Sequence, residues 1–182
     1  NSNTATLTVN ANPAVELVAA EYANLTPYTP SALYSTVSPA TGTYSYVWRR
    51  DGGIVPGAVN SSLPVNVDWF GEYDVTVTDQ NGCSRTSNRV MIADSVDNLV
   101  FIYPNPSTGI FQVRYYASTT TEFSLNVYDS KGGRVWSRKY PVTARYEQML
   151  VDLGRNASGV YLVEVKGSNG KRLAAGKVSI QR

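Results

Sequence analysis

Hydrophobic and polar side chains alternate with a period of two along most of the chain, and helical periodicity is hard to find. Alternating apolar positions occur at residues 44–48, 63–67, 73–77, 111–115, 125–127, 161–165 and 178–180. Pairs such as Asn81-Gly82, Gly132-Gly133 and Asn169-Gly170 separate these runs, and such pairs are typical of tight turns and hairpins. Short strands at this spacing are typical of antiparallel sandwiches. The pattern therefore predicts an all-β fold.

An internal repeat relates the two halves of the chain. Gly71–Val77 runs on to Asn81-Gly82, and Gly159–Val165 runs on to Asn169-Gly170, with the matching positions at one offset of 88 residues. Each half is therefore expected to end with the same hairpin. The tyrosine two places after each leading glycine is where an immunoglobulin-like sandwich has its tyrosine corner, and Trp48 fits the buried tryptophan of such a fold. The repeat predicts two tandem Ig-like antiparallel β-sandwiches.

The expected domain boundaries follow from this repeat and from composition. We place the sandwiches at residues 13–93 and 99–182. Residues 94–98 are small and polar and suit an exposed linker. Residues 1–12 resemble the last strand of the first sandwich, and two interpretations stay open. They are either the end of a preceding repeat, which would make the chain the tail of a longer protein, or the first strand of this domain.

Composition removes several classes of chemistry. The chain has no histidine, which excludes His-based triads, the common His-liganded zinc sites and a histidine pH switch. Cys83 is the only cysteine, so an intrachain disulfide and a Cys-rich metal site are excluded, and we expect a free, partly buried thiol. No apolar run is long enough to span a bilayer as a helix.

Charge is spread unevenly between the halves. Residues 1–98 carry 4 basic and 9 acidic side chains, a balance of −5, whereas residues 99–182 carry 12 basic and 5 acidic ones, a balance of +7. This asymmetry indicates two units with different surroundings or partners. The positive half could meet an acidic docking surface, although plain solubility explains the same balance.

The segment 101–111, Phe-Ile-Tyr-Pro-Asn-Pro-Ser-Thr-Gly-Ile-Phe, combines several backbone constraints. Pro104 and Pro106 lack a backbone N–H and hold φ at about −65°, so the segment cannot be a central strand. Asn105 is driven toward an extended conformation by the proline that follows it. Gly109 then permits the backbone reversal that starts the next strand. Taken alone, this is a stiff bend at the entrance of the second domain.

The residues of this segment also resemble a known family. Tyr103–Gly109 closely resembles the opening motif of the C-terminal sorting domain (type A) of type IX secretion system substrates. The resemblance continues through the Tyr-Asp-x-x-Gly hairpin in Val127–Val135, then Ser158–Val163, and a basic closing strand through Lys177-Val178. It covers residues 99–182, and three motifs in the right order make it specific.

The resemblance implies a delivery signal with no catalytic role. An outer-membrane translocon would recognise the C-terminal sandwich, and a sortase-like peptidase would cut the linker before it. The passenger would reach the cell surface via the periplasm and outer membrane, and its new carboxyl end could be joined to anionic lipopolysaccharide. The residues implied in sorting are Tyr103, Pro104, Asn105, Pro106, Gly109, Asp129, Gly132, Gly133, Gly159, Tyr161 and Lys177. The residues of the expected cleavage linker are Ala93, Asp94, Ser95, Val96, Asp97 and Asn98.

Two alternatives concern other classes of function. The acidic residues are too scattered for a glycosidase pair or a calcium loop, so the sequence predicts no enzyme, no metal, no cofactor and no nucleic-acid partner. The first sandwich could instead be an adhesive or carbohydrate-binding module. Its candidate stacking rings are Tyr22, Tyr28, Tyr34, Trp69 and Phe70. Three exposed coplanar rings in a row would favour sugar binding, and none would favour the spacer that we prefer.

Overall fold

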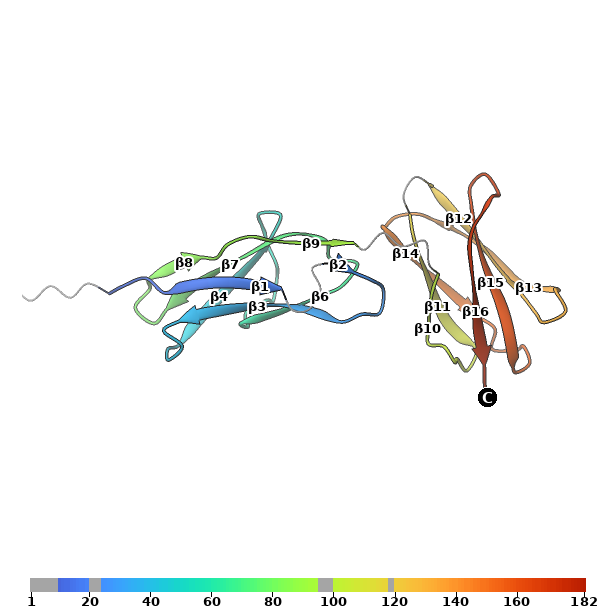
Figure 1. Ribbon diagram of the computed structural model, residues 1–182, viewed down its shortest axis with the longest axis horizontal. Coiled ribbons are helices and arrows are strands. Elements are labelled where there is room, and N and C mark those ends of the chain that lie inside the picture. Colours follow the sequence, from blue (N-terminus) through green and yellow to red (C-terminus); the bar gives the residue numbers. More distant parts are fainter. Residues whose placement is uncertain (1–9, 20–23, 95–99, 118–119) are drawn as a thin grey trace, which may run out of the picture. The chain divides into compact units, whose positions relative to one another are not determined.

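The chain folds into two compact all-β units (Figure 1). The computed structural model describes residues 10–19, 24–94, 100–117 and 120–182. The first unit takes its strands from residues up to 94, and the second takes its strands from residues after 100. The predicted all-β class, two Ig-like sandwiches in tandem, is confirmed. No helix capable of crossing a membrane occurs in the part of the chain that the structure describes.

The first unit consists of a three-stranded sheet, ordered β1-β3-β6, and a six-stranded sheet, ordered β2-β9-β7-β4-β5 with β8 also pairing β7. Its pairings are antiparallel except for the short parallel contact between β2 and β9. The strand bounds are β1 Ala14–Ala19, β2 Asn24–Leu25, β3 Ser31–Ser38, β4 Tyr44–Arg50, β5 Gly53–Ile54, β6 Ser62–Val65, β7 Gly71–Asp79, β8 Ser84–Thr86 and β9 Val90–Asp94.

The core of the first unit lies where the alternating apolar positions predict. Leu17 and Leu33 of the smaller sheet and Trp48 and Tyr73 of the larger one are fully buried. The predicted tyrosine corner is present, because the Tyr73 hydroxyl donates a 2.5 Å hydrogen bond to the carbonyl of Trp69. Burial is the main cause that raises the pKa of Tyr73 above its ordinary value.

The second unit is a sandwich of a three-stranded and a four-stranded sheet, ordered β10-β11-β14 and β13-β12-β15-β16. Every pairing between its strands is antiparallel. The strand bounds are β10 Phe101–Tyr103, β11 Ile110–Tyr116, β12 Glu122–Tyr128, β13 Arg134–Pro141, β14 Tyr146–Asp152, β15 Gly159–Gly167 and β16 Arg172–Ile180.

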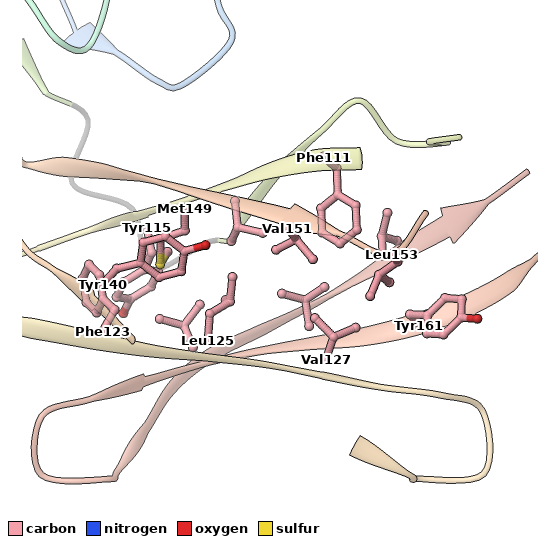
Figure 2. Close-up of a cluster of buried hydrophobic side chains, with 14 of the residues drawn as sticks. Phe111, Tyr115, Phe123, Leu125, Val127, Tyr140, Met149, Val151, Leu153 and Tyr161 are labelled. Carbon is pink, nitrogen blue, oxygen red and sulfur yellow. The ribbon is translucent and has the colours of Figure 1, made fainter. Parts of the chain in front are cut away.

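A single hydrophobic cluster fills the space between these two sheets (Figure 2). Every second side chain of each central strand points into it, as the period of two requires. The fully buried members include Val113, Phe123, Leu125, Val127, Met149, Val151, Val163, Val165 and Val178. Each such side chain contributes roughly 1.5–3 kcal/mol by leaving water. The second unit therefore has a core of its own.

The internal repeat is visible in strand pairing. β7 and β15 are both nine residues long and start 88 positions apart, and Gly71 pairs with Ile92 as Gly159 pairs with Ile180. The closing strand differs between the units, because the first unit divides it into β8 and β9. Between them the Asn88 side chain accepts the Leu17 N–H at 2.7 Å and donates to the Leu17 carbonyl at 3.0 Å.

Two residues of the expected cleavage linker lie in a strand. Ala93 and Asp94 belong to β9 and pair with Asn24 and Leu25 of β2. Their small and polar side chains do not oppose this pairing, which is made by the backbone. The rest of the expected linker lies outside the described residues, as do residues 1–9 of the proposed first strand.

Candidate functional site

The Pro-Asn-Pro segment connects β10 to β11 and lies along the free edge of β16. β10 pairs antiparallel with β11, so residues 104–109 reverse the chain between them. Tyr103 ends β10 with 58% of its surface exposed, and Pro104, Asn105 and Pro106 are exposed as well. The predicted bend is therefore present, and it is a surface feature of the second unit.

The side chain of Asn105 binds β16 as a backbone peptide would. Its Nδ2 donates to the carbonyl of Lys177 at 3.0 Å, and its Oδ1 accepts the N–H of Ser179 at 3.0 Å. Residues two apart on a strand direct their backbone groups to the same side, which is why one amide can reach both. Asn105 thus satisfies two edge groups of β16 where Pro104 and Pro106 have no N–H to offer.

Ser107 continues this edge pairing with its own backbone. Its N–H donates to the Ser179 carbonyl at 2.8 Å, its carbonyl accepts the Gln181 N–H at 2.8 Å, and it forms a parallel bridge with Ile180. The Ser107 hydroxyl is buried, donates to the Ile110 carbonyl and accepts the Gly109 N–H. Ser107 was not among the residues singled out from sequence, although it lies inside the quoted motif.

Gly109 is required by its surroundings. Its φ is +127°, and a Cβ placed on it would lie 3.1 Å from the Cα of Gly154. Its carbonyl accepts the Leu153 N–H at 2.8 Å, so the segment is joined to the loop after β14. Arg182 reaches the same loop, where its Nη2 donates to the carbonyls of Leu153 and Gly154. Sequence analysis did not foresee this contact, since nothing local to either segment signals it.

The Asp129 hairpin joins β12 to β13. Asp129 Oδ1 accepts the N–H groups of Lys131 and Gly133 at 2.9 and 2.8 Å. Gly132 supplies a φ of +81°, and a Cβ on Gly133 would lie 3.0 Å from Asp129 Oδ2. The register of the hairpin shifts at Val127 and Tyr128. Asp129 and its glycines therefore shape a turn.

The last three predicted residues lie on β15 and β16. Gly159 begins β15 with a φ of +154° and pairs with Ile180. Tyr161 is buried, and its hydroxyl donates to the Ala157 carbonyl at 2.7 Å, which confirms the predicted second tyrosine corner. Lys177 is exposed on the outer face and lies opposite Leu162.

The predicted sorting residues gather at one end of the second unit. Strand direction explains this, because β10, β12, β14 and β16 end where β11, β13 and β15 begin (Figure 1). We call this end, formed by residues 104–109, 129–133, 153–159 and 180–182, the motif end. The predicted residues at this end shape turns, pair with the edge of β16 or form the buried tyrosine corner. No nucleophile–base pair occurs among them. The described residues contain no group of three or more metal-ligating side chains.

Of the described candidate stacking rings, only Tyr34 lies on a strand, and Tyr28 groups with the second unit, where it stacks on Tyr103 with ring centroids 5.0 Å apart. Tyr22 lies outside the described residues. Tyr34 is exposed on β3, whereas Trp69 is partly exposed just before β7, which belongs to the other sheet. The Arg50 guanidinium lies over the Trp69 ring, 5.4 Å from its centroid. Cys83 is a free, half-buried thiol, as expected.

Comparison with protein families gives one match. Residues 101–181 match the family described as "Secretion system C-terminal sorting domain", and this match covers less than half of the chain. The resemblance to type IX secretion system sorting domains seen in the sequence is confirmed for the second unit. This family of sorting signals is not catalytic, and its members are secreted to the cell surface or extracellular space.

Comparison with solved structures gives matches at low sequence identity. The human OSCAR ligand-binding domain is 15% identical, with a TM-score of 0.38, 96% of this chain covered and 97% of that chain. Dimeric latent PorU from Porphyromonas gingivalis is 13% identical, with a TM-score of 0.39, 93% of this chain covered and 20% of that chain. The Bacteroides ovatus glucan-utilization protein SGBP-B, solved with a mixed-linkage heptasaccharide, is 16% identical, with a TM-score of 0.37, 95% of this chain covered and 48% of that chain. No curated protein matches the chain.

Proposed function

We propose that the second unit, a type IX secretion system C-terminal sorting domain, delivers a passenger protein across the outer membrane to the cell surface. The observation that carries the proposal is the family match at residues 101–181. The gathering of the motif residues at one end of the unit supports it further. A recognition signal needs an exposed and rigid surface, and exposed Pro104, Asn105 and Pro106 held along β16 meet both needs.

The proposed route follows from this family. An outer-membrane translocon recognises the sandwich, and a sortase-like peptidase cuts the chain before it. Since Ala93 and Asp94 of β9 pair with β2, we place the scissile bond in Ser95–Asn98. The freed carboxyl end of the passenger is then available for linkage to anionic lipopolysaccharide.

We assign the first unit a spacer function next to the sorting domain. Of the described rings that were candidates for sugar stacking, only Tyr34 lies on a strand, and Arg50 covers a face of Trp69. Both findings favour a spacer over the carbohydrate-binding alternative. We also propose that neither unit is an enzyme. Asp79 and Asp129 accept backbone N–H groups within turns. Glu72 and Glu122 form ion pairs with Arg89 and Lys139.

A reporter fusion tests the delivery function. Residues 99–182 are joined to a secreted reporter with a signal peptide in a bacterium that has this secretion system, and the surface-exposed reporter is measured. We expect surface delivery with the domain and periplasmic retention without it. Equal delivery after deletion of residues 99–182 would show that the proposal is wrong.

Mass spectrometry of the exported full chain tests the cleavage site. The expected carboxyl terminus of the mature passenger lies within residues 95–98. A terminus inside residues 105–182 contradicts cleavage in the linker, because the sorting domain would then remain partly attached.

A further inference from the structure

Two exposed apolar side chains lie side by side on the outer face of the four-stranded sheet. Val160 and Leu162 of β15 are 55% and 40% exposed, while their neighbours Tyr161 and Val163 point into the core. Alternation along the strand explains this division. A solvent-facing strand normally places polar residues at such positions. Val160 and Leu162 are therefore unusual for an outer face.

The strand register brings parts of several motifs around these two residues. Leu162 lies opposite Lys177 of β16 on one side and Tyr128 of β12 on the other. Val160 lies opposite Ser179, whose N–H donates to Asn105. We call the outward surface of Tyr128, Val160, Leu162, Lys177 and Ser179 the β15–β16 face. This face extends from β16, whose edge Asn105 binds, across β15 to β12, which leads into the Asp129 hairpin.

The charge on this face is positive. Lys177 is exposed and forms no salt bridge within the part of the chain that the structure describes. Glu164, the next outward residue of β15, already accepts the Tyr128 hydroxyl at 3.0 Å and Lys166 Nζ at 3.2 Å. A cation beside an apolar pair is complementary to a carboxylate beside an apolar side chain.

We propose that the β15–β16 face is the surface by which the export machinery holds the domain, through a protein segment that carries an apolar side chain next to a carboxylate. The apolar side chain covers Val160 and Leu162, and the carboxylate pairs with Lys177. This inference rests on the proposed delivery function and names the recognition surface within it.

The second exposed apolar group of the unit provides a contrast. Ile110 and Leu150 are exposed on the outer face of the other sheet, at 55% and 49%. Ile110 lies opposite Asp152, so an acid borders this pair, and both residues of the pair line a pocket with Tyr28, Tyr103 and Pro104. An acidic partner segment is not complementary to it. Ile110 and Leu150 therefore serve as a control of similar exposure on the other sheet, beside Tyr103 and Pro104 of the motif.

The test uses the full chain with a secreted reporter and two double variants. Val160→Thr with Leu162→Thr places β-branched, strand-compatible side chains at both positions of the proposed face and makes them polar. Ile110→Thr with Leu150→Thr makes the same change on the control face. We expect surface delivery to fall at least tenfold in the first double variant and to stay within twofold of the parent in the second, with equal thermal unfolding midpoints.

Lys177 is tested separately by charge. Lys177→Glu should reduce delivery by a similar factor, Lys177→Arg should retain it, and Lys171→Glu, a change of equal charge in the β15–β16 turn, should have little effect. A photo-crosslinking residue at position 162, but not at 150, should capture a component of the secretion machinery.

The outcomes separate this inference from the proposed function. If deletion of residues 99–182 abolishes delivery while both double variants are delivered equally, the domain is a signal but its recognition surface is not the β15–β16 face. If deletion has no effect, the delivery function itself is wrong. Loss of delivery in the control variant alone would place recognition on the β10-β11-β14 sheet and also overturn the inference.

Discussion

Asn105 shows how one side chain can take the place of a strand. Its amide offers one donor and one acceptor, and these match the Lys177 carbonyl and the Ser179 N–H of β16. Aspartate has no donor to offer at this position, and a longer amide would displace the contact. An unpaired strand edge is prone to pairing with another chain, so Asn105 and Ser107 also protect the end of β16.

Replacing Asn105 by alanine should loosen this edge without disturbing the core. We expect faster amide hydrogen exchange at Ser179, whose N–H loses its acceptor, and a decrease in unfolding free energy of about 1–2 kcal/mol for two lost hydrogen bonds. Exchange at Val163, in the centre of the core, should be unchanged. Unaltered exchange at Ser179 would contradict the role given to the Asn105 amide.

The two tyrosine corners predict a second effect at this scale. In Tyr161→Phe the ring stays buried and the hydrogen bond to the Ala157 carbonyl is lost, so the unfolding free energy should fall by roughly 0.5–1.5 kcal/mol. Urea unfolding followed by circular dichroism measures the change. Tyr34→Phe, on an exposed strand position, is the control and should change stability by less than about 0.5 kcal/mol.

At the scale of elements, the turn between β10 and β11 places a glycine against the backbone of another loop. Gly109 has a positive φ and stands against the backbone of Gly154, which a side chain cannot displace without moving the loop after β14. Gly132 also has a positive φ, but nothing lies within 4 Å of the Cβ it lacks. Comparing substitutions at the two glycines therefore separates the effect of a positive φ from the effect of a steric contact.

Gly109→Ala should therefore be more damaging than Gly132→Ala. We expect about 1 kcal/mol of destabilisation at Gly132 from the positive φ alone, and about 2–4 kcal/mol at Gly109, where the contact adds to it. Thermal unfolding of both variants in the full chain measures the difference. Equal losses would mean that the Gly154 loop yields freely and that the close approach carries no constraint.

At the scale of the whole molecule, the second unit has the elements of an independent domain. Its two sheets enclose one hydrophobic cluster, and its surface carries most of the positive charge of the chain. A delivery signal that works on different passengers must fold without help from them. The family match at residues 101–181 agrees with this division.

Residues 99–182 alone should fold. We expect a β-rich circular dichroism spectrum, a single cooperative unfolding transition, and dispersed amide resonances, because the cluster contains enough buried apolar residues for a domain of this size. A non-cooperative transition, or a spectrum typical of an unfolded chain, would show that the second unit needs the first. Such a result would also require the reporter fusion to include both units.

The sequence by itself determined the features that depend on nearby residues. Period-two alternation placed Trp48 and Leu125 in cores, and the tyrosine-corner bonds of Tyr73 and Tyr161 each span only four residues. The turn at Asp129 is equally local, since its carboxylate caps amides two and four positions ahead. A local pattern is sufficient for such features, because the interacting groups are close along any chain of that sequence.

The tertiary structure alone decided which distant segments meet. Asn105 forms hydrogen bonds with partners 72 and 74 residues away, and Arg182 donates a hydrogen bond to the Gly154 carbonyl, 28 residues before it. The pairing of Ala93 with β2 is made by backbone groups that every residue possesses, so composition indicated a linker there. Backbone hydrogen bonds carry no side-chain signature, and the choice of partner depends on how the two sheets close around their shared core.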